Sequence, residues 1–183
     1  MNWTIPGTTL TAPRANADRT DEMFSSMFLA GGMVLSQIAS ITGLEPYAIQ
    51  NWVKRGFLSP PVNKRYTMEQ LCRILIINML KGALPMEKIC SMLTYINGDL
   101  ADESDDIIDD TVLYFMFVKL AARARHIGGN QSWEEAIENA MSAYAEPIPG
   151  ARIRVEKVLR VMLMAYISSR FKLQVDAMVD ELH

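Results

Sequence analysis

The chain has 183 residues, half of them hydrophobic, and a formal net charge of −3. This length suits one or two small domains with a real hydrophobic core. No uninterrupted apolar run reaches the roughly 20 residues that a bilayer span needs. The first residues also lack the cationic and apolar stretches of a secretory signal. These features argue against a membrane-spanning protein, and we expect a cytoplasmic one.

Residue types that carry catalysis or bind metals are sparse. Cys72 and Cys90 lie in apolar segments, where free thiols pack as small hydrophobic side chains, and His126 and His183 are isolated. The sequence has no zinc spacing, nucleophile elbow or glycine-rich phosphate loop. The seven carboxylates in residues 99–110 lack the alternating ligands and central glycine of a calcium loop, so we expect a solvated linker there. We expect no catalytic residue, no bound metal and no cofactor.

Residues 1–34 carry the weakest pattern in the chain. Prolines and small polar residues up to about Arg19 predict an extended or mobile arm. Asp21 is a candidate cap for a short helix, which Gly31 and Gly32 would end. The apolar side chains of this helix are expected to pack on the rest of the fold.

Residues 35–66 predict two short helices, a glycine turn and a basic loop. Ser36 is a candidate cap for the first helix. Gly43 suits the turn, because glycine adopts positive φ without a Cβ clash. Pro46 suits the first turn of the second helix, and two further prolines stiffen the loop that follows it. The pattern is typical of a helix-turn-helix with a small wing.

The second of these helices separates an apolar face from a polar one. Ile49, Trp52 and Val53 have the spacing of a buried face. A major groove admits one helix, whose amide side chains read base edges while nearby cations attract phosphates. Double-stranded DNA is therefore the predicted partner, and Tyr47, Gln50 and Asn51 are candidate base readers. The full set of candidate DNA contacts is Tyr47, Gln50, Asn51, Lys54, Arg55, Lys64 and Arg65.

Helices are predicted for most of the remaining chain. Thr67 and Gln70 form a capping box ahead of a helix that reaches about residue 81, and a further helix covers about 85–95. Three more are expected, at about 107–126, after a capping box formed by Ser132 and Glu135, and from about 152 through 178. Thirteen methionines favour an ordinary core over a pocket for a small apolar effector. The same surface is alternatively a dimer interface.

Charge is distributed unevenly along the chain. Residues 35–97 carry seven cations against three acids, which gives +4, whereas residues 98–183 carry nine cations against fifteen acids, which gives −6. A nucleic-acid-binding protein needs attraction only on the contacting face. The asymmetry therefore agrees with DNA binding by the first segment.

The segments 35–66 and 71–96 resemble the MerR family of bacterial regulators. The resemblance lies in the turn, the second helix, the wing and the next two helices: Thr42 and Gly43, residues 52–58, Lys64 and Tyr66, residues 67–71, and residues 84–93. The whole chain is also similar to an uncharacterised bacterial family that joins a MerR-like N-terminal half to a helical C-terminal half.

This resemblance implies an all-α fold with at most a minimal β wing. Residues 1–34 would form an N-terminal arm with a short helix. Residues 35–98 would form a MerR-like winged helix-turn-helix domain. Residues 99–183 would form a small helical bundle for dimerisation or effector binding.

Two functional hypotheses follow. The first is a homodimeric DNA-binding transcriptional regulator that reads paired half-sites. The second is a helix-turn-helix that serves as a protein–protein interaction module without DNA binding. It is motivated by departures from the family pattern, because the second helix lacks the usual arginines and Glu45 adds a negative charge at its start.

Overall fold

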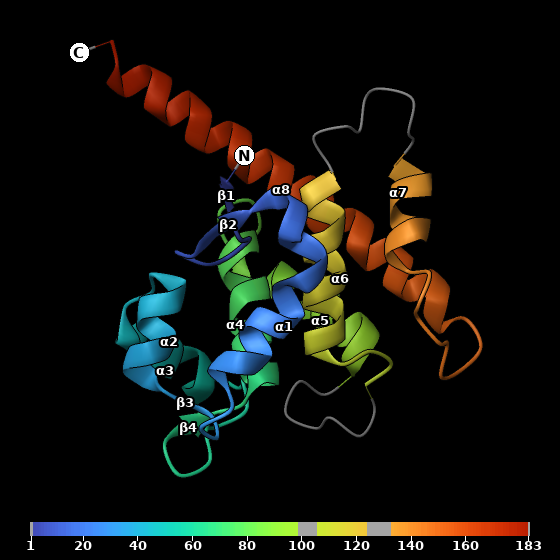
Figure 1. Cartoon of the computed structure of the whole chain (residues 1–183), viewed down its shortest axis with the longest axis horizontal. Coiled ribbons are helices and arrows are strands. Elements are labelled where there is room, and N and C mark those ends of the chain that lie inside the picture. The colour runs from blue at the N-terminus through green and yellow to red at the C-terminus, as the bar shows by residue number, and fades with distance from the viewer. Residues whose placement is uncertain (1, 99–105, 124–132, 183) are drawn as a thin grey trace.

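The computed structural model describes residues 2–98, 106–123 and 133–182. The elements are, in order, β1 (Asn2–Thr4), β2 (Thr11–Pro13), the 3-10 helix η1 (Arg14–Arg19), α1 (Thr20–Met27), β3 (Met33–Val34), α2 (Leu35–Thr42), α3 (Pro46–Lys54), β4 (Arg65–Tyr66), α4 (Met68–Leu80), α5 (Met86–Asn97), α6 (Asp110–Arg123), α7 (Trp133–Ala140) and α8 (Ala151–Asp180) (Figure 1). β1 pairs with β2, and β3 with β4, in two small antiparallel sheets. A mostly α-helical fold is thereby confirmed.

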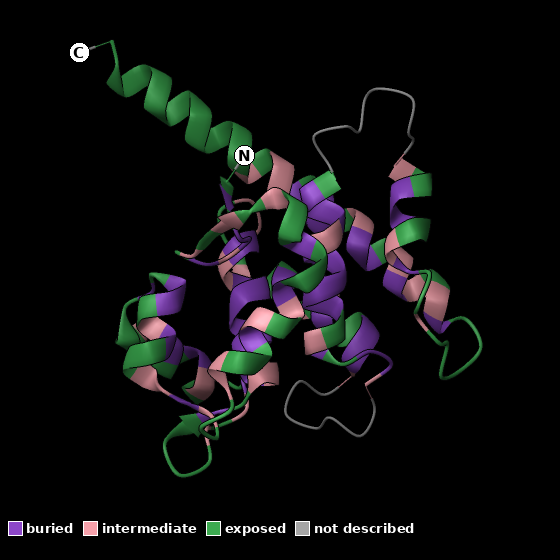
Figure 2. Cartoon of the chain, in the orientation of Figure 1, coloured by how far each residue is buried: buried purple, intermediate pink, exposed green. Residues whose placement is uncertain are grey.

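The core is centred on α4 and α6, which pack against each other. Both helices are apolar on nearly every side, and a helix of that kind is stable in water only when other elements surround it. Figure 2 shows the buried residues concentrated at this centre. α5, α7 and the first half of α8 cover the rear of the core, and α2 packs on α4 from the other half of the chain.

The N-terminal segment is extended in two short strands, as one of the two alternatives predicted for it requires, and it contributes to this core. Trp3 and Ile5 are buried, and β1 and β2 form a hairpin over this segment. The hydroxyl of Tyr114, at the centre of α6, donates a 2.8 Å hydrogen bond to the carbonyl of Pro6. The small polar residues that suggested mobility form the turns of the hairpin.

The wing is a tight hairpin next to α3. Asn63 and Lys64 occupy its tip with φ of 50° and 60°, and an isolated bridge joins Val62 to Arg65. Positive φ at both central residues is what a two-residue hairpin turn needs to match the twist of its strands. Because β4 also pairs with β3, the wing is attached directly to the start of α2.

Three helix starts differ from the sequence prediction. α1 begins at Thr20 with Arg19 at the N-cap position, so Asp21 is not the cap. α2 begins at Leu35, and Gln37 accepts a 3.0 Å hydrogen bond from the backbone N–H of Val34, so Ser36 is not the cap. α6 begins at Asp110 instead of residue 107, because the Asp109 carboxylate accepts bonds from the first free N–H groups of the helix.

Other predicted starts are confirmed or lie outside the described residues. In the box ahead of α4, the N–H of Gln70 donates to the Thr67 hydroxyl at 3.1 Å, and the N–H of Thr67 donates to the Gln70 side chain at 2.9 Å. Ser132 was predicted to cap α7, and His126 was the predicted end of the helix before it. Neither residue is among the described residues.

α8 is one continuous helix of 30 residues, in agreement with the predicted extension through residue 178. Its first half is buried on one side as far as Ala165. Residues 171–180 are all exposed, and Figure 1 shows this end of the helix projecting beyond the body of the molecule.

Candidate nucleic-acid interface

The outward face of α3 carries the predicted base readers. Tyr47, Gln50, Asn51 and Lys54 recur at helical spacing, and all four are exposed, Tyr47 to 72%. Ile49 and Trp52 on the opposite face are buried against α2 and the core. The apolar side thus fixes the orientation of the helix, and the polar side is presented to solvent.

The polar face of α3 is free of internal partners. Among the described residues, none forms a hydrogen bond or ion pair with the side chains of Tyr47, Gln50, Asn51 or Lys54. Figure 1 shows α2, α3 and the wing together at one side of the molecule, opposite α7. The face is therefore not covered by the acidic rear half, and its donors and acceptors are available to a ligand.

The wing holds the predicted phosphate contacts in different ways. Lys64 is exposed at the tip of the hairpin. Arg65 is also exposed, but its Nη1 donates a 3.0 Å hydrogen bond to the carbonyl of Gly32, which joins the wing to the segment before β3. Arg65 is consequently both a surface cation and a structural tie, whereas Lys64 is a surface cation only.

A groove of about 510 Å³ separates α3 from the wing. Gln50 lies on one wall and Lys64 on the other, so the structure brings these two predicted residues to one site. Most of the remaining lining is apolar: Val34, Leu35, Val53, Pro61 and Tyr66, with Ser36 at the edge. Tyr66 is buried, and this burial raises the pKa of its hydroxyl.

Arg55 and Glu45 lie at the two ends of α3. The Arg55 guanidinium lies over the Phe57 ring, 4.6 Å from its centroid, which restrains the cation beside the helix C-terminus. Glu45 is exposed at the N-cap position, and its side chain makes no capping bond. It remains a negative charge at the start of the helix that would enter a groove.

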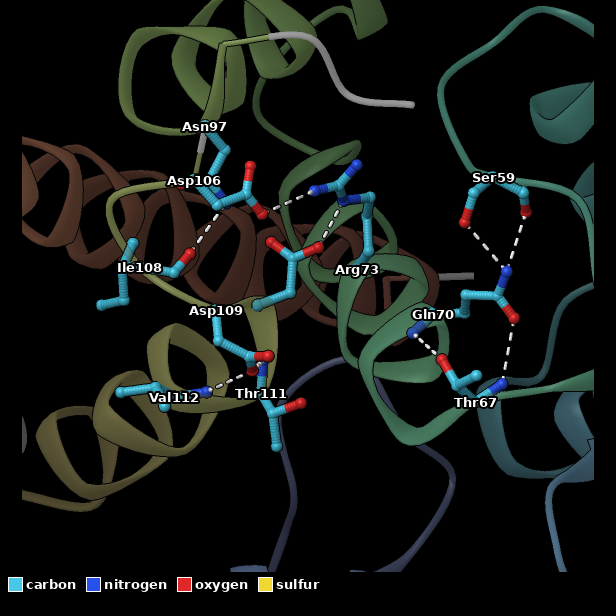
Figure 3. A network of polar contacts seen from close by, with 11 residues as sticks. Ser59, Thr67, Gln70, Arg73, Asn97, Asp106, Ile108, Asp109, Thr111 and Val112 are labelled. Carbon is cyan, nitrogen blue, oxygen red and sulfur yellow. Dashed lines mark hydrogen bonds and ion pairs between the residues drawn. The ribbon is translucent and has the colours of Figure 1, made fainter. Parts of the chain in front are cut away.

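Arg73 does not belong to the surface charge of this interface. It lies on α4 and is only 5% exposed. Its Nε donates to Asp110, and its Nη2 lies 4.0 Å from Asp106, as Figure 3 shows for the labelled Arg73 and Asp106. The expectation of a solvated acidic linker is therefore wrong for these two carboxylates. Without Arg73, the cations that residues 35–97 can present to a ligand number six.

The sequence contained a signal for this buried cluster. Arg73 interrupts a run of apolar residues on α4, and an arginine in such a run must be paired if it is buried. Between Asp106 and Asp110 lie the buried Ile107 and Ile108 and the exposed Asp109. This spacing indicates that one side of the segment 106–110 faces the core, but the sequence does not identify Arg73 as the partner of the carboxylates.

The two cysteines are free, and neither has the properties of a reactive thiol. Burial, and then the charge of Asp110, raise the pKa of Cys72 well above the usual value. Burial also raises the pKa of Cys90. Both groups are therefore protonated at neutral pH, and the thiolate is the nucleophilic form.

The described residues offer neither a metal site nor a membrane span. No group of three or more His, Cys, Asp or Glu side chains is arranged to hold a metal ion in residues 2–98, 106–123 and 133–182. Within the same residues, no helix combines the length and the hydropathy that crossing a bilayer requires.

Residues 32–117 match a family model described as "Domain of unknown function (DUF1836)". This segment runs from just before β3 into α6, so it includes α2, α3 and the wing. The protein described as "Uncharacterized protein YkrK" of Bacillus subtilis (strain 168) is 34% identical over 84 residues, which are 44% of this chain and 36% of that relative. No solved structure matches the chain. The segment that carries the candidate interface is thus similar to proteins whose descriptions name no activity.

Proposed function

We propose that this protein is a sequence-specific regulator of transcription that binds double-stranded DNA, with α3 in the major groove and the wing on phosphates. The single observation that carries the proposal is the exposed and unpartnered polar face of α3 beside a cationic hairpin. This combination supports the MerR-like docking on DNA that we expect from the sequence.

The dimensions of α3 support this docking. It has nine residues, and an α-helix with its side chains is about 10–12 Å across. A major groove is about 12 Å wide and admits one α-helix. Gln50 and Asn51 lie near the middle of the exposed face, where an amide can donate and accept at an adenine edge.

Phosphate attraction would come from four cations of each protomer: Lys54, Arg55, Lys64 and Arg65. Each neutralised phosphate contributes about 0.9 to the slope of log affinity against log salt concentration. Four phosphate contacts would contribute modestly to the affinity for DNA, and the negative charge of Glu45 would oppose them. Two protomers acting together would double the number of contacts, so the proposal includes a homodimer.

The outer face of α8 is the surface that we propose for that homodimer. Met164, Phe171 and Met178 recur every seven residues, as do Ser168, Val175 and Leu182. The five apolar members of this stripe are each at least 56% exposed. Two interleaved seven-residue repeats form the seam by which helices pair. Because these residues face away from the body, a second molecule can reach them.

Charge favours an antiparallel arrangement of two such helices. Arg170 and Lys172 lie early in the projecting part of α8, and Asp176, Asp180 and Glu181 lie late. Antiparallel pairing places the cationic end of one helix beside the acidic end of the other, whereas parallel pairing places like charges together. Parallel and antiparallel pairs both have the two-fold symmetry of most homodimers, so charge is what favours the antiparallel one.

Selection from a random pool of duplex DNA with the purified full chain tests the proposed function. A near-palindromic sequence should be enriched, because a two-fold symmetric protein reads paired half-sites. Gln50→Ala and Asn51→Ala should relax the enriched sequence at particular positions, and Asn139→Ala on α7 should leave it unchanged. A folded protein that enriches no sequence would contradict DNA reading.

The groove beside α3 favours a second candidate function, a protein-interaction module. Its walls at Val34, Leu35, Val53 and Pro61 are more apolar than phosphate contacts require. An extended peptide with an apolar side chain would suit such a groove better than a sugar-phosphate backbone. A protein that is not retained on heparin or duplex DNA at low salt, but holds a stable protein partner through Val53, would support this function instead.

A further inference from the structure

A second groove, which we call the α8 groove, lies on the side of α8 opposite the apolar stripe. It has a volume of about 390 Å³, and its walls are the segment 4–8, the C-terminal end of α4 and the residues of α8 from 166 to 176. Leu173 and the partly buried Tyr166 give it apolar surface, and the buried Ile5 and Met79 also border it. A volume of this size is in the range of small-molecule sites, roughly 300–1,000 Å³.

The charged groups of the α8 groove are mainly cationic. Lys81, Arg170 and Lys172 line it, against the single carboxylate of Asp176. None of these four side chains forms an ion pair or hydrogen bond with another residue in the described part of the chain. Loss of hydration lowers the pKa of Lys81, although the residue as a whole is exposed to solvent. A bound anion would restore the interactions that Lys81 lacks.

A serine hydroxyl adds a neutral donor to the same groove. The Oγ of Ser169 is buried and has no hydrogen-bond partner among the described residues. Because this oxygen is closed off from solvent, a ligand reaches it only after the side chain rotates toward the groove, and accepting from it would then relieve the unfavourable burial of an unpaired hydroxyl. Gly82 faces this hydroxyl, and a Cβ placed there would lie 3.2 Å from Oγ. The glycine thus keeps the space beside Ser169 open.

We propose that the α8 groove binds a small organic carboxylate that has an apolar chain. The carboxylate would lie between Lys81 and Arg170 and accept from Ser169, and the chain would lie along Tyr166 and Leu173. Both parts are needed, because the walls bury apolar surface and the cations select the charge of the head group.

The α8 groove is connected to the helix-turn-helix by one side chain. Asn78, which lines the groove, donates 2.8 Å hydrogen bonds from Nδ2 to the carbonyls of Gly7 and Thr42. Thr42 is the last residue of α2, at the turn before α3. A ligand that fixes the segment 4–8 would therefore stiffen the support of that turn. This regulatory consequence rests on the proposed DNA binding, whereas ligand binding itself does not.

Titration calorimetry of the full chain with octanoate, below its micelle concentration, tests the site. Saturable binding is expected for octanoate, and none for octylammonium or acetate, which change the charge or remove the chain. Lys81→Met with Arg170→Met should weaken octanoate binding at least about tenfold, because two charge-assisted contacts are lost. Lys88→Met, an exposed lysine on α5, should bind octanoate as the unmodified protein does.

Several outcomes would overturn the site: no saturable octanoate binding, equal binding of octylammonium, or equal affinity in the Lys81 and Arg170 variant. Inorganic phosphate serves as a further arm, and phosphate binding as tight as octanoate would show a site for the anion alone, against the proposal. Affinity for the selected duplex, with and without octanoate, is measured separately. Octanoate binding by a protein that binds no duplex would uphold the site and refute the DNA-binding function.

Discussion

Arg73 on α4 donates to Asp110 at the first position of α6, and both side chains are almost fully buried. The pair connects the helix that supports the wing to the central helix of the rear half. The carboxylate of Asp106 lies 4.0 Å from Nη2 of the same guanidinium. A buried arginine that faces two carboxylates fixes how these two helices pack, because separating them would leave buried charges unpaired.

Arg73→Met should destabilise the protein by about 3–5 kcal/mol, because it leaves buried carboxylates without their cation. Adding Asp110→Asn should recover part of this loss, because the substitution removes one of those charges. Urea unfolding measured by circular dichroism gives both values. Arg123→Met is the control, since its 3.3 Å pair with Asp18 is exposed and should contribute less than about 1 kcal/mol. Equal losses for Arg73 and Arg123 would contradict the importance of the buried cluster.

Local patterns in the sequence were sufficient to predict several elements. They were not sufficient to predict contacts between residues far apart in the chain. The box formed by Thr67 and Gln70 was predictable because its two hydrogen bonds depend only on residues three apart. The outward face of α3 was predictable from helical spacing. By contrast, Arg73 and Asp110 are 37 residues apart, and only tertiary packing selects one as the partner of the other.

The N-terminal hairpin shows a different limit of sequence reasoning. Its threonines, prolines and glycine have the composition of a mobile arm, and the strands are only three residues long. Trp3 and Ile5 are buried in the same apolar core as residues of α4 and α6, and no pattern within the first 13 residues specifies that core. The wing was easier to predict, since its cations lie in the loop that follows a predicted helix. Its turn residues, Asn63 and Lys64, are nevertheless not the usual asparagine–glycine pair.

The exposed cations next to α3 should control affinity for all duplex sequences alike. Lys54→Ala with Lys64→Ala removes two phosphate contacts, so binding should weaken and the salt slope should fall by about 2. Arg65 is left in place, because its hydrogen bond to Gly32 supports the wing and its loss would mix charge with structure. Fluorescence anisotropy across a salt series measures the slope. Lys157→Ala, on α8, should leave it unaltered, and the same slope in all three proteins would argue against the wing as a phosphate contact.

Alkaline pH should destabilise the fold through buried groups that stay protonated. Burial, and then Asp110, raise the pKa of Cys72 well above 9.0, and burial does the same for Tyr114 above 10.0. Between the unfolded and folded pKa values the folded state binds more protons, so stability falls as pH rises. The contribution of Cys72 to stability is complete below its unfolded pKa. It is lost progressively as the pH rises from that value through the folded pKa.

Urea midpoints at about pH 8 and about pH 10.5 measure this effect, since these values lie on either side of an ordinary thiol pKa. Cys72→Ala lowers stability at both pH values, because it leaves a small cavity, but the difference between them should shrink. Part of the difference should persist, because Tyr114 still titrates. An unchanged difference in the variant would show that Cys72 does not contribute to alkaline destabilisation.

The outer stripe of α8 should decide whether the protein is a dimer. Phe171→Ser with Met178→Ser removes two apolar positions of one seam, and sedimentation equilibrium should then report a monomer. Leu173→Ser is a matched control, because Leu173 is 64% exposed and Phe171 is 63% exposed, but Leu173 lies on the other side of the helix. Lys172→Glu should weaken an antiparallel dimer, and Glu181→Lys in the same chain should restore it, since the two ends exchange signs. A dimer that persists in the double serine variant, or dissociates equally in the Leu173 control, would place the interface elsewhere.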